Sequence, residues 1–151
     1  MKTFSILIVI MTLISMTIVP LAYAKPGPST AQYMEITHMT MRFDGPDAYV
    51  SINYNLDLFS NIYVFMLGSR NLEKTFELVF SDFESLEVLE IGRNHASLKL
   101  MNVSRETDDY YLHDSRELGT TIDTLTIVYP GGSDRVTRNV NSTPNIFYVK
   151  N

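Results

Sequence analysis

The hydrophobic periodicity of this chain changes twice, and these changes limit the folds that it can adopt. Over residues 33–56, and again from residue 86 onward, apolar and polar side chains alternate, which is the period of a half-buried strand. Between these regions, apolar residues recur at spacings of three and four, as in an amphipathic helix; they are Leu72, Phe76, Val79, Phe80 and Phe83. The order of strands, helix and strands predicts an α+β fold, with an antiparallel sheet of about five to seven strands and one or two helices, from residues 57–83, packed on one face.

Two strands are predicted ahead of the helix. They cover residues 33–43 and 48–56, and the turn between them contains Gly45 and Pro46. By alternation, one face of the first strand carries Glu35, Thr37, Met39 and Met41, and the other carries Ile36, His38 and Thr40. The second strand directs Val50, Ile52, Tyr54 and Leu56 toward the core. We expect the two strands to form a hairpin.

Hydrophobic periodicity also predicts the secondary structure before and after the amphipathic helix. Helical spacing favours a helix over residues 58–67 that ends at Gly68, but Val64 and Phe65 interrupt its polar face, so a buried strand is the alternative. Strands are then predicted over residues 86–91, 96–103, 110–112, 121–129, 136–140 and 146–149, the first two as a second hairpin. A polar loop is predicted over residues 104–109, and a turn or short helical piece over 114–119.

The first 24 residues have the composition of a secretory signal peptide. Lys2 is followed by an uncharged, apolar run from Thr3 to Ala24, which closes with small residues at Ala22 and Ala24, as a cleavage site requires. Because the run is also long enough to span a bilayer, an uncleaved N-terminal membrane anchor over residues 3–24 is the alternative. In both cases the positive-inside rule predicts that the rest of the chain is extracytoplasmic, either secreted or at the cell surface.

The remainder of the chain is predicted to form a linker and one domain. Residues 25–32 contain two prolines and a glycine and predict an extended linker. Residues 33–151 predict a single globular domain, since this length can bury a core of its own. The chain has no cysteine, so packing and hydrogen bonds must hold this exported domain together without disulfides.

The charge balance of the predicted mature chain is acidic. Lys2 is one of 12 basic residues and the only charge in the first 24 residues, which leaves 11 basic against 17 acidic residues, a net charge of −6. Such a chain repels phosphate backbones, and its basic residues are scattered singly. The balance argues against nucleic-acid binding, and the N-terminal apolar run is the only predicted contact with a membrane.

The densest cluster of metal-ligand residue types lies between Glu106 and Asp114. Carboxylates beside an imidazole could hold a divalent cation or activate a water, which makes Asp108, Asp109, His113 and Asp114 candidate metal ligands. Their spacing matches neither an EF-hand nor a zinc-protease helix. We therefore interpret the segment as a solvated acidic loop that leads into an edge strand, and we predict no metal and no other cofactor.

The remaining patterns of catalytic residue types predict no reaction. The three histidines, His38, His95 and His113, have no spacing that indicates a shared metal site. His113 adjoins Asp114 and Ser115, but neighbours in the chain do not point toward one another as a catalytic triad requires, and no G-x-S-x-G segment is present. We predict no catalytic residues.

Two glycosylation sequons lie at the edges of predicted loops. They begin at Asn102 and at Asn141, and Pro144 directly follows the second. Export would make both asparagines candidate glycosylation sites, and the chain a candidate glycoprotein. A glycan at either position would shield surface and add no chemistry.

Three segments carry a resemblance to a known group of proteins. They are residues 63–69, 113–119 and 143–148, with the sequences YVFMLGS, HDSRELG and TPNIFY. With these segments the chain resembles an uncharacterised family of small exported proteins of methanogenic and related archaea. That family has no assigned activity, cofactor or catalytic residue, so the resemblance implies a surface or envelope-associated role and no chemistry.

These observations predict an exported, non-enzymatic envelope or surface module with a binding or structural role, whose partner is a protein or another envelope component. One alternative is a small metal-assisted hydrolase that uses the loop of residues 106–114. A second alternative is a membrane-tethered accessory subunit held by an uncleaved segment 3–24.

Overall fold

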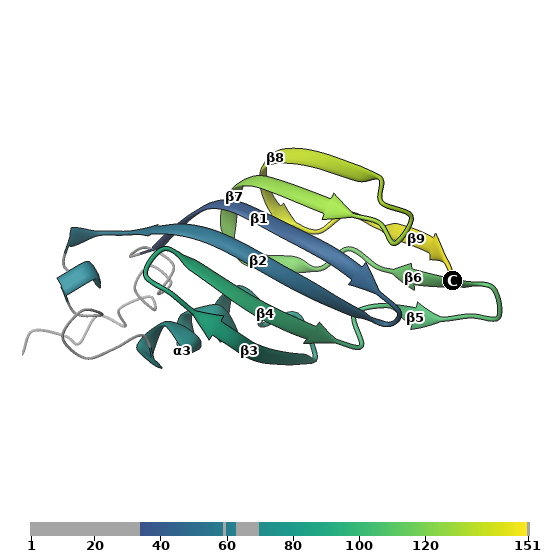
Figure 1. The fold of residues 1–151 in the computed structure, drawn as a ribbon, viewed down its shortest axis with the longest axis horizontal. Helices are drawn as coiled ribbons and strands as arrows, with labels where there is room; N and C mark the ends of the chain where they lie inside the picture. Colours follow the sequence, from purple (N-terminus) through teal and green to yellow (C-terminus); the bar gives the residue numbers. More distant parts are fainter. Residues whose placement is uncertain (1–33, 59, 63–69, 151) are drawn as a thin grey trace, which may run out of the picture.

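The computed structural model describes residues 34–58, 60–62 and 70–150, which form an α+β fold with two sheets (Figure 1). The six-stranded sheet has the order β3-β4-β2-β1-β7-β8, and the three-stranded sheet the order β5-β6-β9. The strands of the larger sheet are β1 (Met34–Asp44), β2 (Asp47–Leu56), β3 (Ser85–Ile91), β4 (His95–Met101), β7 (Glu117–Val128) and β8 (Asp134–Ser142). Those of the smaller sheet are β5 (Arg105–Glu106), β6 (Tyr110–His113) and β9 (Ile146–Val149). The helix α3 (Arg70–Val79) precedes β3.

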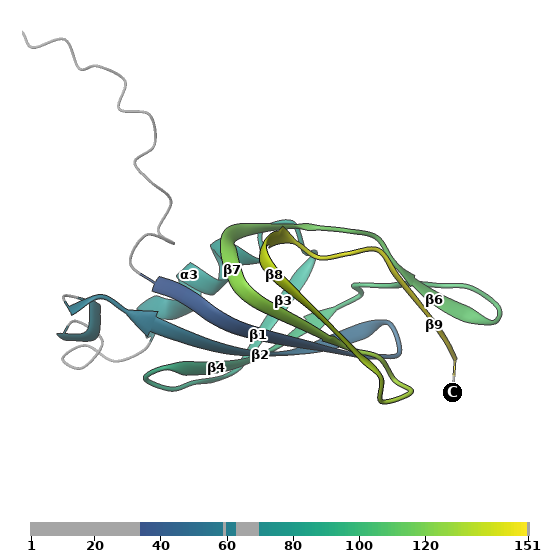
Figure 2. The ribbon, with the colours of Figure 1, turned by 90° about the horizontal axis from the view of Figure 1, so that it is seen from above.

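The helix and the three-stranded sheet cover one face of the six-stranded sheet (Figure 2). Phe43 of β1 is paired with Ala48 of β2, and Tyr54 lies on the same face of β2 as Ala48. Tyr54 meets Phe76 of α3 with ring centroids 5.7 Å apart, whereas Phe43 meets Tyr148 of β9 at 5.3 Å. A single core therefore continues from α3 to the small sheet.

The predicted antiparallel pairing is confirmed for most of the larger sheet and is wrong between β1 and β7. These two strands run parallel, with Ile36 opposite Ile122 and Met41 opposite Ile127. A tight turn can join only antiparallel neighbours, but the chain between β1 and β7 contains α3 and a hairpin and is long enough to return in the same direction. The six-stranded sheet is therefore mixed.

The predicted first hairpin is confirmed. β1 and β2 pair antiparallel, and Gly45 in their turn has a φ of +57°, which glycine adopts without strain. Val50, Ile52 and Tyr54 are buried as expected.

The faces predicted for the first strand are only partly correct. A bulge between Ile36 and His38 shifts the register of β1 against β2. The extra residue reverses the alternation, so that even-numbered residues face the core before the bulge and odd-numbered residues face it after the bulge. The buried residues of β1 are therefore Met34, Ile36, Met39, Met41 and Phe43.

The amphipathic stripe of residues 72–83 is confirmed, and all five of its apolar members are buried. The helix itself ends at Val79, four residues earlier than the stripe. Phe80 and Phe83 lie in the following turn, where the Phe83 N–H donates to the Phe80 carbonyl at 2.9 Å. The turn thus extends the buried face of α3 toward β3.

Strand limits differ from the predictions where side chains hold the backbone. β4 ends at Met101 because Asn102 adopts a left-handed φ of 55°. The predicted turn or helical piece over residues 114–119 is wrong for its second half, since β7 begins at Glu117. The Glu117 N–H donates to the Asp82 carboxylate at 2.9 Å, and this long-range contact leaves no periodic pattern in the sequence.

Several sequence predictions fall on residues outside the described ones, namely the leader, the linker and residues 63–69. Of the favoured helix over residues 58–67, residues 58 and 60–62 are helical. Leu58 and Ile62 are 73% and 51% exposed, so this short helix does not bury the predicted apolar face at these two positions. In the described part of the chain, no helix combines the length and apolar character needed to cross a membrane.

Gly119 allows the start of β7 to approach the end of α3. A Cβ atom at this position would lie 2.4 Å from the Leu78 carbonyl oxygen and 3.2 Å from the Val79 Cα. Both atoms belong to the backbone and cannot move aside as a flexible side chain does. Only glycine therefore permits this contact between helix and sheet.

Candidate binding surface on the three-stranded sheet

The segment predicted as a solvated acidic loop is only partly exposed. Asp108 and Asp109 lie in the exposed turn between β5 and β6, and Asp114 is exposed just after β6. His113, the last residue of β6, is fully buried because alternation places it on the inner face of the small sheet. The solvated-loop interpretation is therefore wrong for His113, and the structure separates it from the three carboxylates by burial.

Both ring nitrogens of His113 form hydrogen bonds. Nδ1 lies 2.7 Å from the carbonyl oxygen of Val103, and Nε2 lies 2.9 Å from the hydroxyl oxygen of Thr143. A carbonyl oxygen only accepts, so Nδ1 carries the hydrogen and Nε2 of the neutral ring accepts from Thr143. The Arg116 N–H donates to the same hydroxyl oxygen at 3.0 Å, and the Thr143 hydrogen has its nearer acceptor in His113 Nε2, since the alternative, the Arg116 carbonyl, lies at 3.5 Å. These contacts define one tautomer of a neutral imidazole.

Aromatic rings enclose His113. The imidazole centroid lies 5.1 Å from the Phe43 ring and 6.4 Å from the Phe83 ring. Burial lowers the pKa of His113 from its ordinary value of 6.5; the hydrogen bond to Val103 and the Asp114 charge raise it, and the Arg116 charge lowers it further. The pKa and the hydrogen bonds therefore favour the same uncharged form.

A second contact fixes the inner face of the small sheet through Tyr148. The Tyr148 hydroxyl donates to the Gly45 carbonyl at 2.6 Å and lies 2.9 Å from the Ser104 hydroxyl. Gly45 belongs to the turn of the first hairpin, so this bond joins β9 to the end of the larger sheet. The small sheet is thus anchored at both His113 and Tyr148.

The charged residues of the small sheet pair with one another. Asp114 accepts a hydrogen bond from Arg105 at 2.8 Å, and Glu106 pairs with Lys150 at 2.7 Å. Within the described ranges, no three residues of the types His, Cys, Asp or Glu are arranged to hold a metal ion.

The three histidines lie on three different strands. His95 begins β4 and is exposed. His38 lies in β1, with Nε2 at 3.4 Å from the Thr126 hydroxyl oxygen, and His113 ends β6. Each histidine therefore has different neighbours.

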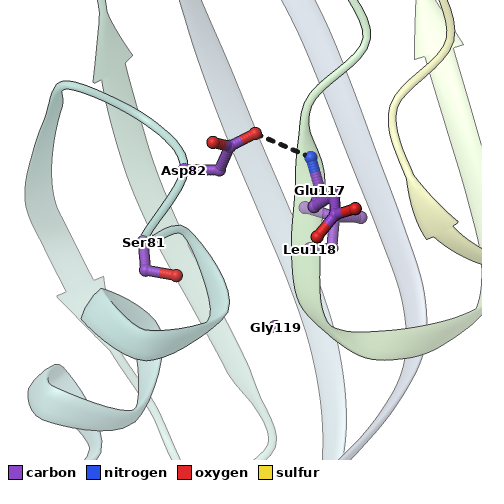
Figure 3. A pocket seen from close by; sticks show the side chains of 5 residues that line it. All are labelled: Ser81, Asp82, Glu117, Leu118 and Gly119. Atoms are coloured by element: carbon purple, nitrogen blue, oxygen red, sulfur yellow. Dashed lines mark hydrogen bonds between the residues drawn. The ribbon is translucent and has the colours of Figure 1, made fainter.

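A hollow of about 220 Å³ lies where the turn after α3 meets β7 (Figure 3). It is lined by Ser81, Asp82, Glu117, Leu118 and Gly119. Two carboxylates in one hollow are candidates for acid–base chemistry, but Asp82 accepts hydrogen bonds from the Glu117 N–H and, through its carbonyl, from Arg116 at 2.8 Å. These bonds hold the turn against β7 and give Asp82 a structural role.

Arg116 lies between this hollow and His113. Its guanidinium carbon is 5.6 Å from the Phe83 ring centroid, and its Nε is buried with no hydrogen-bond partner. The backbone of Arg116 also accepts from the Thr143 N–H at 2.9 Å. The side chain and backbone of Arg116 thus connect the turn after α3 with the segment before β9.

The hydroxyl groups of both sequons are buried. Ser104 is 6% exposed and bonded to Tyr148, and Thr143 is 1% exposed and bonded to His113, although Asn102 and Asn141 are exposed. A transferase that recognises these hydroxyls would have to act before the segments fold. Glycosylation at either asparagine stays a prediction.

The outer face of the three-stranded sheet carries exposed apolar side chains. Tyr110 is paired with Val149, and Leu112 with Phe147, so all four share this face. Phe147 is 73% exposed, Val149 68% and Tyr110 43%, while Leu112 is half-buried. Large contiguous patches of exposed apolar residues mark interaction sites in soluble proteins. We refer to these four residues as the outer apolar patch.

The sequence predicts β9 with the correct limits and β6 one residue too short, but it does not reveal the outer apolar patch. Strands of four residues show alternation without showing which face packs on the domain. The burial and the hydrogen bonds of His113 and Tyr148 identify the inner face.

No protein-family model, no curated protein and no solved structure matches this chain. Similarity to known proteins therefore carries no function over to it.

Proposed function

We propose that the chain is an exported, non-catalytic binding module of the cell envelope or surface, and that the outer apolar patch is its contact surface. The exposure of Phe147 carries the proposal. A phenylalanine that is 73% exposed beside a valine that is 68% exposed leaves apolar area in water, which a partner would remove. Aromatic side chains are also enriched at the centres of protein interfaces.

The anchoring of the small sheet supports this proposal. His113 and Tyr148 hold the inner face of the same sheet that presents Phe147 and Val149 on its outer face. A surface that is already ordered loses little conformational entropy when it binds. The polar groups of this region therefore serve to position a contact surface.

The composition of the first 24 residues supports export, and the exported domain is then either free or tethered to the membrane. Cleavage after Ala24 would give a free exported domain, whereas retention of residues 3–24 would give a membrane-tethered accessory subunit with the same contact surface. The intact mass of the protein isolated from its host decides between them, because a chain that begins at Lys25 has lost the tether. The hydrolase alternative has no support from the geometry, since both ring nitrogens of His113 are engaged within the fold.

Site-specific photo-crosslinking tests the contact surface in producing cells. A photo-reactive phenylalanine analogue at position 147 should give a discrete cross-linked product. The same analogue at Val136, which is 54% exposed on β8, is the matched control and should give none. Equal cross-linking at both positions, or none at position 147, would contradict the proposal.

A further inference from the structure

The free edge of β9 points to a second copy of this chain as the partner, and we propose that two copies pair through their β9 strands. The inference rests on the proposed function, because β9 carries Phe147 and Val149 of the outer apolar patch.

The backbone of β9 leaves two residues with open hydrogen-bonding groups. Among the described residues, β9 pairs only with β6. The Lys150 N–H donates to the Asp109 carbonyl at 3.2 Å, and hydrogen-bonded positions alternate along an antiparallel pair. Tyr148 and Ile146 therefore direct their N–H and C=O groups toward β6, whereas Phe147 and Val149 direct theirs toward the free edge.

The other edge strands carry features that oppose pairing. β3 has a bulge between Val88 and Glu90, and β8 has a left-handed residue at Asn139 with φ 52°. Charged residues on these edges are Glu87 and Glu90 on β3, Asp134, Arg135 and Arg138 on β8, and Arg105 and Glu106 on β5, which has only two residues. β9 has no charged residue between Ile146 and Val149. Its edge is therefore the one best suited to strand addition.

A two-fold axis beside Tyr148 gives a complete pairing. In this register Phe147 lies opposite the partner's Val149, and Val149 lies opposite the partner's Phe147. Both are hydrogen-bonded positions, so all open groups of the two residues are used. Each cross-strand pair joins an aromatic with a β-branched residue, a favourable combination in sheets. The contact is isologous, as most homodimer contacts are.

The two Lys150 side chains would not repel each other strongly in this pairing. Lys150 would lie opposite the partner's Ile146, which separates the two Lys150 residues by about four positions, or ~13 Å along the strand. Each Lys150 also keeps its ion pair with Glu106 of its own chain, at 2.7 Å. The small sheet extends beyond the ends of β1, β2 and β4, with β9 between β6 and the β7–β8 hairpin (Figure 1). The two small sheets would join into one sheet of six strands.

Sedimentation velocity of the purified exported protein tests the dimer. We expect a monomer–dimer equilibrium that shifts with concentration. Val149→Lys should weaken the dimer at least tenfold, because lysine on an edge strand opposes pairing, whereas Val136→Lys on β8 should leave it unchanged. Val149→Pro, which removes an N–H that β6 does not use, should abolish the dimer and leave the thermal midpoint of the dilute monomer unchanged. A monomer at every concentration, or a dimer that resists both changes at Val149, would overturn the proposal.

Cysteine cross-linking tests the register, and the chain has no native cysteine to interfere. Phe147→Cys and Val149→Cys should each form little disulfide-linked dimer alone, but a mixture of the two variants should form it, because position 147 faces position 149. Opposed residues at hydrogen-bonded positions lie about 5.5 Å apart between Cα atoms, within the range of a disulfide. Linkage of either variant with itself at the rate of the mixture would contradict this register.

The two proposals can fail separately. A cross-link at position 147 in cells to a protein other than this chain, with a purified monomer, would refute the dimer and retain the contact surface. A purified dimer with no cross-link at position 147 in cells would retain the pairing and refute its use as a contact surface in the envelope.

Discussion

The hydroxyl oxygen of Thr143 lies 2.9 Å from Nε2 of His113, although 30 residues separate them in the chain. This contact joins the segment before β9 to the end of β6, and the Arg116 N–H supports it from the start of β7. Because the imidazole can accept from Thr143 only while it is neutral, the packing of the small sheet is linked to the protonation of His113.

The first prediction concerns the pH dependence of stability. His113 of the unfolded chain takes up a proton near its ordinary pKa of 6.5, whereas burial lowers its pKa in the folded state. The unfolded state therefore binds more protons below this pH, and the free energy of unfolding should fall as the pH decreases from 6.5 toward the lowered pKa of the folded state. Urea midpoints measured from about pH 8 to about pH 5, the range in which histidine titrates, should show this decline.

His113→Gln is the control for that prediction. Glutamine can still hydrogen-bond but cannot take up a proton, so the decline should be smaller in this variant. Asp47, whose pKa is lowered chiefly by the hydrogen bond with Lys99, loses its stabilising effect only below its ordinary pKa of 3.8, outside this range. The same decline in wild type and variant would show that His113 is not its cause.

The second prediction concerns the packing of α3. Phe76 is fully buried against Tyr54, and its replacement by alanine leaves a cavity. We expect Phe76→Ala to lower the free energy of unfolding by about 3–5 kcal/mol. Leu78→Ala, at a neighbouring position that is 49% exposed, should change it by about 0.5 kcal/mol or less. Chemical denaturation of both variants checks this, and similar losses would contradict the observed burial.

The third prediction concerns the contact between α3 and β7. In Gly119→Ala the new Cβ atom meets the Leu78 carbonyl oxygen at 2.4 Å, so the helix or the strand must move. We expect a loss of about 1–3 kcal/mol in the free energy of unfolding. Gly131→Ala is a matched control because nothing lies within 4 Å of its new atom. An unchanged denaturation midpoint for Gly119→Ala would show that the approach is looser than described.

The fourth prediction concerns metals. Asp114 and Glu106 already pair with Arg105 and Lys150, and His113 is buried, so the acidic segment has no prepared cation site. The thermal midpoint should therefore be the same in EDTA as in millimolar calcium or zinc. A rise with metal that disappears in Asp108→Asn with Asp109→Asn would restore these residues as ligands, since a bound ion stabilises the folded state.

Local pattern was sufficient to predict the strands whose alternation is regular. The limits of β9 and the inward residues of β2 follow from period two alone. The bulge in β1 could not be predicted from the sequence. The extra residue, Thr37, reverses which alternating side chains of β1 face the core, and nothing in the residue types around it signals this change. The parallel pairing of β1 with β7 depends on tertiary contacts between residues 86 positions apart, such as Ile36 and Ile122.

The candidate site shows the same limit. Closeness in sequence grouped His113 with Asp108, Asp109 and Asp114, but alternation on β6 turns His113 inward, and the carboxylates lie in exposed loops. Extending the predicted strand by one residue, from Leu112 to His113, would have placed the imidazole on the inner face. The exposure of Phe147 could not be predicted, since an apolar residue in a strand is usually a core residue.

Thiol labelling on intact producing cells tests most directly the claim that the outer apolar patch is a contact surface. Phe147→Cys and Val136→Cys are both exposed in the isolated chain and should react at similar rates in dilute purified protein. On cells, we expect that cysteine at position 147 is protected while cysteine at position 136 keeps reacting. Equal labelling of the two positions on cells would contradict it.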